Sequence, residues 1–291
     1  MVGEDLPGAD IKDHIAQAVQ LAFEAHENVV PPRSLLQDYC GRLRKALYEW
    51  FAELRDSGVS RSYACFANHV VKRDDCVLTF NYDSSVEREL RLAGKWDIGD
   101  GYGFDVGGFS SGSVVKVLKL HGSIGWLAQA SGLPTPGSSK GGLQVFADTR
   151  PVFPCSELEF LEYRGISDPI FSAALPNQPL LIMPEKKKRF DIQTGGDPEW
   201  GWFWQSLWSK ADDALRRADR IVICGYSMPL ADEMARNLLL NFPNENAEIL
   251  VVSGKTQTKG IVDEYQRKGY AGAVASKESY FEDWVAYRSV N

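Results

Sequence analysis

The fold is decided by an apolar run that ends in a polar cluster, Cys76-Val77-Leu78-Thr79-Phe80-Asn81-Tyr82-Asp83. Its first five residues are mostly apolar, β-branched or aromatic, a composition typical of a buried strand. Asn81 and Asp83 then bring an amide and a carboxylate to the end of that strand. An amide donates and accepts hydrogen bonds and a carboxylate accepts them, so this strand end can hold a polar ligand.

Two further apolar runs end in the same way. Residues 114–120 lead into His121-Gly122-Ser123, and residues 221–224 lead into Gly225-Tyr226-Ser227. A weaker example is the run that ends at Ser253. Ligands of open parallel sheets bind beside the carboxyl ends of the strands, so we expect these clusters to share one site.

The spacing of the apolar runs predicts an α/β fold. Strands are expected at 76–80, 114–120, 179–183, 220–224 and 248–253, with a weaker one near 271–275. Helices are expected between them at about 84–93, 199–218 and 230–241. This alternation indicates a Rossmann-like, doubly wound and mostly parallel sheet.

The remaining segments complete one structural domain. Residues 1–75 are expected to be helical and to pack on the sheet, with helices at 11–26 and 34–55 and a short one near 63–71. Residues 76–291 form the sheet domain, with a small inserted subdomain at about 127–178. A Gly- and Ser-rich stretch, 130–145, is expected to be a loop within it.

Composition excludes several classes of protein. The net charge of -7 argues against a nucleic-acid-binding protein, which normally carries a basic excess. No apolar stretch approaches the ~20 residues of a membrane span, and the first residues do not resemble a secretory signal. Five cysteines include no C-x-x-C pair, so we expect no zinc site, and free, buried thiols at Cys76 and Cys224. These features together predict a cytoplasmic protein.

Each polar cluster also has a structural interpretation. Asp83 or Ser84 can cap the next helix along the chain. His121 can be a structural histidine, although its ordinary proton affinity also suits acid–base chemistry near neutral pH. The turn at 225–227 can serve backbone geometry alone, or its amides can bind a phosphate at a helix start. We interpret the aromatic residues of 199–218 as a packing face and the basic run 186–189 as a solvated surface.

Taken together, the motifs Thr79–Asp83, Lys119–Trp126 and Gly225–Asp232 resemble the sirtuin-like domain of bacteria. They are most similar to the diverged branch found in anti-phage defence NADases, including Thoeris-type effectors. The order and spacing of the motifs match, and the resemblance covers roughly residues 60–285.

The resemblance implies that NAD is the substrate and that its nicotinamide–ribose bond is broken. Asn81 would position the ribose and the attacking water, and His121 would act as the general base. Asp83 would bind near the nicotinamide amide. The residues expected to contact the cofactor are Thr79, Asp83, Gly122, Ser123, Gly225, Tyr226, Ser227 and Ser253. Expected partners are NAD and either a second copy of the chain or another component of a defence system.

The sequence departs from the family in two ways. Sirtuin deacylases carry a four-cysteine zinc module, whose absence from this sequence favours NAD hydrolysis over protein deacylation. The family also opens with a β-strand, a Gly-Ala-Gly-type loop and a Gly-Leu-Pro-like stretch, and here Glu4–Gly8 resembles that last stretch alone. A truncated or misassigned start, another segment in that place, or a degenerate domain would each explain the missing first strand. The alternative function is therefore an NAD or ADP-ribose sensor or an assembly module.

Overall fold

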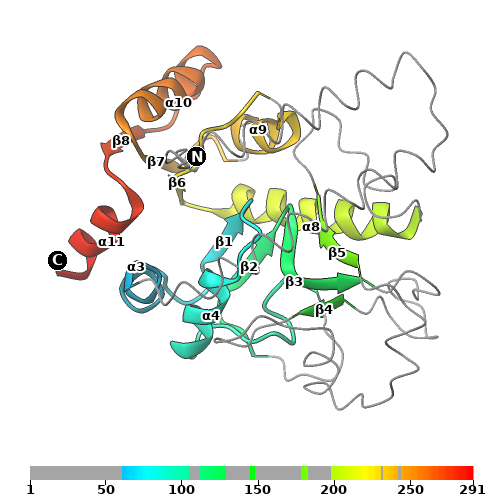
Figure 1. The fold of residues 1–291 in the computed structure, drawn as a ribbon. Helices are drawn as coiled ribbons and strands as arrows, with labels where there is room; N and C mark the ends of the chain where they lie inside the picture. Colours follow the sequence, from blue (N-terminus) through cyan, green and yellow to red (C-terminus); the bar gives the residue numbers. More distant parts are fainter. Residues whose placement is uncertain are drawn as a thin grey trace, which may run out of the picture. The chain divides into compact units, whose positions relative to one another are not determined.

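The computed structural model describes residues 61–104, 112–128, 145–147, 178–182, 198–230, 232–241 and 244–290. These residues form a mixed α/β fold with small parallel sheets (Figure 1). The helices expected at 11–26 and 34–55, the segment Glu4–Gly8, the basic run 186–189 and most of the loop 130–145 lie outside the described residues.

Two compact units make up the chain, and each is described by itself. The motif unit spans residues 32–182 and 189–208, and the C-terminal unit spans 209–291 together with 1–31 and 183–188. The boundary expected near residue 75 stays a prediction, because residues 1–60 are not among those described.

The motif unit is built on a parallel strand pair. Strand β1 (Cys76–Thr79) pairs with β2 (Lys116–Lys119), and Thr79 lies opposite Lys119. Helix α4 (Ser85–Leu92) comes after β1 and packs against the short helices α3 (Arg61–Cys65) and η1 (Phe66–Val70). The strands predicted at 76–80 and 114–120 and the helix predicted at 84–93 are therefore confirmed.

A second, antiparallel sheet was not predicted. Strand β3 (Gly122–Ala128) lies between β4 (Val145–Ala147) and β5 (Gln178–Leu181) and is antiparallel to both. The strand expected at 179–183 is thus present as β5, but its place in a parallel sheet was wrong. The reason is that β3 begins three residues after β2 ends, with no crossover helix that would carry the chain back to form another parallel strand.

Aromatic side chains form the core of the motif unit. Tyr102, Trp126 and Trp204 are fully buried. The ring centre of Trp126 lies 4.9 Å from that of Tyr102 and 6.3 Å from that of Trp204. Trp204 belongs to helix α8 (Pro198–Arg217), whose Leu207, Trp208, Ala211 and Leu215 are buried as well. The interpretation of the aromatic residues of this helix as a packing face is confirmed for Phe203, Trp204 and Trp208.

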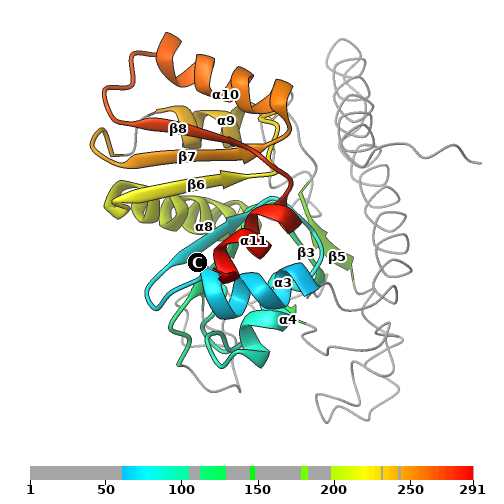
Figure 2. The same cartoon turned by 90° about the vertical axis from the view of Figure 1, so that its left-hand side faces the viewer.

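The C-terminal unit contains a fully parallel three-stranded sheet. Its strands are β6 (Arg220–Cys224), β7 (Glu248–Ser253) and β8 (Val274–Glu278), in that order. Helices α9 (Glu233–Leu240) and α10 (Lys255–Arg267) lie on one face of this sheet and α11 (Phe281–Val290) lies on the other (Figures 1 and 2). Helices on both faces explain why β7 is almost entirely buried and apolar.

Sequence patterns located β6 and β7 but not two of the helices. Helix α10 buries only Thr258, Ile261 and Tyr265, so its apolar stripe is too sparse to be recognised from periodicity. Helix α11 buries Trp284 and Val285. The last strand lies at 274–278 instead of 271–275.

The cysteines of the described ranges are free thiols, and the prediction that Cys76 and Cys224 are buried was wrong for Cys76, whereas Cys224 is half-buried. Cys76 is exposed, because it is the first residue of β1, where the strand emerges from a turn. Burial and the nearby Glu282 raise the pKa of Cys224 to about 11, so this thiol stays protonated near neutral pH. None of the described helices is long and apolar enough to cross a membrane.

The contact between α9 and α10 generates a first prediction. The buried Tyr265 hydroxyl donates a hydrogen bond of 2.8 Å to the Leu239 carbonyl. Tyr265→Phe leaves that carbonyl without its partner and should lower the free energy of unfolding by about 1–2 kcal/mol. Urea denaturation measures the change. The control is Tyr280→Phe, at a residue that is 72% exposed, and an equal loss in both variants would contradict the role of the hydrogen bond.

Candidate functional site

The two polar clusters of the motif unit lie side by side. Because β1 and β2 are parallel and in register, Asn81–Asp83 and His121–Ser123 leave the sheet at the same edge. The Leu120 amide donates to the Thr79 carbonyl at 3.0 Å, which extends the pairing beyond the strands. The Ser123 hydroxyl lies 3.3 Å from the Tyr82 carbonyl, to which it donates. The structure therefore brings together clusters that are about 40 residues apart in the sequence.

Asn81 is the exposed member of the first cluster. Its side chain is accessible to solvent, and its backbone amide donates to the Thr79 hydroxyl at 3.1 Å. That bond holds the turn at the end of β1. Tyr82, the next residue, is buried and donates its hydroxyl to the Ile182 carbonyl at 2.8 Å. One residue of the cluster thus anchors it while its neighbour is exposed to solvent.

Asp83 has a structural task. One of its carboxylate oxygens accepts a hydrogen bond of 3.0 Å from the Ser85 amide, at the first residue of α4. This bond satisfies one of the amides that the first turn of a helix leaves without a partner. The helix-starting interpretation of Asp83 is confirmed, and the Ser84 side chain makes no capping hydrogen bond.

His121 is enclosed by aromatic rings. The imidazole is only 4% exposed, and its ring centre lies 5.1 Å from Phe80, 6.3 Å from Tyr82 and 6.4 Å from Trp208. Phe80 and Tyr82 flank Asn81 in the sequence, so His121 is packed against both neighbours of the exposed amide. Gly122 comes next with a φ of 83°, a conformation that favours glycine and turns the chain from β2 into β3.

Lys119 is a buried lysine that contacts the first of these clusters, and the sequence patterns did not identify it. Lys119 is fully buried, and its ammonium group lies 2.9 Å from a carboxylate oxygen of Glu87. The same group donates a hydrogen bond to the Asp83 carbonyl. Burial raises the pKa of Glu87, and the charge of Lys119 acts in the opposite direction. A signal was present in the sequence, because Lys119 shares a strand face with the apolar Val117.

The predicted residues of the C-terminal unit form a second group. Gly225 has a φ of 66°, and its amide donates to the Val252 carbonyl at 3.0 Å, so the turn after β6 is held against β7. The Tyr226 hydroxyl lies 3.2 Å from a carboxylate oxygen of Asp232. The Ser253 hydroxyl donates to the Gln257 side chain at 2.7 Å. The parallel pairing of β6 with β7 therefore places the turn at 225–227 and Ser253 at the same edge of this sheet.

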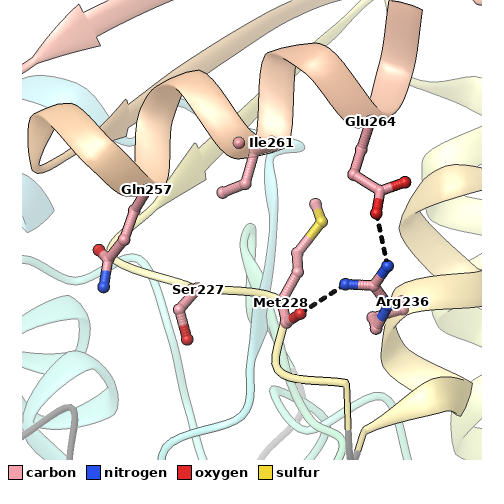
Figure 3. Close-up of a pocket in the computed structure, with 7 residues that line it drawn as sticks. Ser227, Met228, Arg236, Gln257, Ile261 and Glu264 are labelled. Carbon is pink, nitrogen blue, oxygen red and sulfur yellow. Dashed lines mark hydrogen bonds and ion pairs between the residues drawn. The ribbon is translucent and has the colours of Figure 1, made fainter. Parts of the chain in front are cut away.

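A cavity of about 220 Å³ opens beside Ser227 (Figure 3). It is lined by Ser227, Met228, Arg236, Gln257, Gly260, Ile261 and Glu264. Figure 3 shows Gln257, Ile261 and Glu264 along α10, with Ser227 and Met228 on the loop that faces them. Met228 and Ile261 are buried, so the cavity combines apolar side chains with the polar side chains of Ser227, Gln257, Arg236 and Glu264.

Arg236 shapes this cavity. Its guanidinium group donates to the Met228 carbonyl at 2.7 Å and lies 2.8 Å from the Glu264 carboxylate (Figure 3). The first contact holds Met228 at a φ of 51°, a left-handed conformation that is uncommon for a residue other than glycine. Hydrogen bonds from Arg267 and Arg236 lower the pKa of Glu264, so that carboxylate is charged near neutral pH.

The predicted site residues thus fall into two groups. Thr79, Asn81, Asp83, His121, Gly122 and Ser123 gather in the motif unit, and Gly225, Tyr226, Ser227 and Ser253 gather in the C-terminal unit. That all ten contribute to one crevice stays a prediction. Within the described ranges, no three His, Cys, Asp or Glu side chains are grouped as they would be around a metal ion.

Neither a protein-family model nor a curated protein matches this chain. The sirtuin-like resemblance consequently rests on the three motifs alone. A functional proposal has to be argued from the geometry that these motifs adopt.

The capping contact of Asp83 generates a second prediction. Asp83→Ala removes the acceptor for the Ser85 amide and should destabilise the protein by about 1 kcal/mol. Asp83→Asn retains a side-chain oxygen at the same position and should preserve most of that stability. Urea denaturation of both variants is the measurement. Equal losses would show that the carboxylate charge, not the hydrogen bond, matters at this helix start.

Proposed function

We propose that this chain is a cytoplasmic, sirtuin-like NAD hydrolase with a Rossmann-like, doubly wound sheet. In this proposal it cleaves the nicotinamide–ribose bond and acts in anti-phage defence by depleting NAD. The observation that carries the proposal is the neighbourhood of Asn81 and His121. The motifs that contain them are distant in sequence, yet they leave adjacent parallel strands at the same edge, with His121 packed against both neighbours of Asn81.

The chemistry requires little beyond orientation and one proton acceptor. Nicotinamide leaves NAD as a neutral molecule because its ring is positively charged while it is attached to the ribose. Water adds to the oxocarbenium-like carbon, which yields ADP-ribose and a proton. The exposed Asn81 amide can orient the ribose and the water, and a neutral imidazole can accept the proton.

Asp83 would act through its turn as well as through its carboxylate. One carboxylate oxygen holds the start of α4, and the resemblance implies that the same carboxylate lies near the nicotinamide amide. In the C-terminal unit, Gly225, Ser227 and Ser253 would contact the ribose and phosphates. The Ser227 hydroxyl and the Gln257 amide, which line the cavity together with the Arg236–Glu264 ion pair, support recognition of a polar, nucleotide-like group there.

A second candidate function is a sensor that binds NAD or ADP-ribose without cleaving it. The burial of His121 favours this alternative, because an imidazole that is 4% exposed has to be reached by substrate before it can accept a proton. Calorimetry with NAD, combined with chromatographic detection of nicotinamide, separates the two. Binding without nicotinamide release would identify the sensor.

Substitution of the two proposed catalytic residues tests the hydrolase. Asn81→Ala and His121→Phe should each reduce nicotinamide release from NAD by a factor of about 10²–10⁴, the range expected for a lost catalytic group. The phenylalanine refills the space among Phe80, Tyr82 and Trp208, so the fold should survive.

The matched control is Asn68→Ala, at an exposed asparagine of η1 whose side chain donates to the Ala64 carbonyl in the preceding helical turn. Its turnover should equal that of the wild type. Wild-type turnover in His121→Phe would remove the proposed general base, and loss of turnover in Asn68→Ala would indicate that the assay reports folding.

A further inference from the structure

One buried ammonium group connects the three parts of the motif unit that surround the candidate site. Lys119 is the last residue of β2 and lies two positions before His121. Its ammonium donates to the carbonyl of Asp83, which closes the Asn81–Asp83 turn. It also pairs with Glu87 in the first turn of α4. The strand, the turn and the helix therefore meet at a single charged group.

This arrangement is isolated from water. Lys119 and Glu87 are 0% and 1% exposed, and the Tyr102 hydroxyl lies 3.3 Å from the same Glu87 oxygen that pairs with the lysine. Removing two charges from water costs several kcal/mol for each ion, and their attraction only offsets that cost when the geometry is good. An apolar pair of similar size would give comparable or greater stability. A gain in folding free energy therefore does not explain why an ion pair is present at this position.

The position of the pair indicates a different reason. The Asp83 carbonyl is fixed to β2 by Lys119, while the Asp83 carboxylate is fixed to α4 by the Ser85 amide. Asp83, which follows the exposed Asn81 and the buried Tyr82, is thus held from two sides. A turn held in this way cannot move relative to His121, because Lys119 and His121 belong to the same short segment.

We propose that Lys119 and Glu87 are positioning residues, which lock the Asn81–Asp83 turn relative to His121 so that NAD is bound in a reactive orientation. This inference rests on the proposed function. In this proposal, neither Lys119 nor Glu87 contacts the substrate. Misplacement of reacting groups by about 1 Å can reduce a rate by roughly a hundredfold, so a lock of this kind has a measurable effect on catalysis.

The experiment compares the double variant Lys119→Met, Glu87→Gln with the wild type. The double variant removes both charges but keeps side chains of similar length, so the protein should still fold, with a melting temperature lower by only a few degrees because the Asp83 carbonyl loses its donor. Its kcat for nicotinamide release should fall by about ten- to a hundredfold, with a smaller change in KM. Wild-type kcat in a folded double variant overturns the proposal.

Lys116→Met is the matched control. Lys116 lies on the same strand, and its side chain is 39% exposed. Its ammonium group pairs with the Asp100 carboxylate at 2.7 Å and also donates to the Asp100 carbonyl. In the described part of the chain, these side-chain contacts go to Asp100 and not to residues 81–83. Its kcat should not change. Should the double variant fail to fold, Glu87→Gln alone is measured in the same way, since it keeps an acceptor for Lys119 and loosens only the helix side of the lock.

Amide hydrogen exchange separates this inference from the proposed function. If the wild type releases no nicotinamide, the hydrolase proposal fails, and exchange at residues 81–85 then decides the positioning role. Exchange there should be about tenfold faster in the double variant than in the wild type and unchanged in Lys116→Met. Unchanged exchange in the double variant overturns the inference whether or not the chain is an enzyme.

Discussion

The parallel pairing of β1 with β2 is the constraint on which the motif unit depends. It places Thr79 opposite Lys119 and so brings the residues beyond each strand to the same edge of the sheet. The Leu120 amide continues the pairing past the end of β1. A shift of one residue would turn Lys119 to the other face of the sheet, away from Glu87, and separate His121 from the rings of Phe80 and Tyr82. The register of this strand pair therefore determines the geometry of the candidate site in this unit.

Most residues of the candidate site hold the local structure together, and few present an exposed polar side chain. Asp83 starts α4, Tyr82 anchors the turn to Ile182, and Lys119 holds the turn from behind. Asn81 alone in this turn presents an exposed side chain. In the C-terminal unit, Ser253 is bonded to Gln257, whereas Ser227 borders the cavity between α10 and its facing loop.

Much of the fold could be predicted from local pattern. The apolar runs of β1, β2, β6 and β7 and the stripe of α8 are strong enough to be recognised without tertiary information. Helix α10 could not be recognised, because it rests on a single face with three buried residues. The direction of β5 could not be recognised either, since a short apolar run carries no information about which strand it will pair with.

The residue types that end each strand can be read from the amino-acid order alone, and they carry the resemblance that points to NAD. Folding was needed to enclose His121 in aromatic rings, to place Asp83 at the start of a helix, and to pair Lys119 with Glu87 in the interior. The physical reason is that burial and pairing depend on neighbours from elsewhere in the chain. A lysine in an apolar run can face water or the core. Here the carboxylate of Glu87, 32 residues earlier in the chain, pairs with Lys119 and offsets the cost of burying its charge.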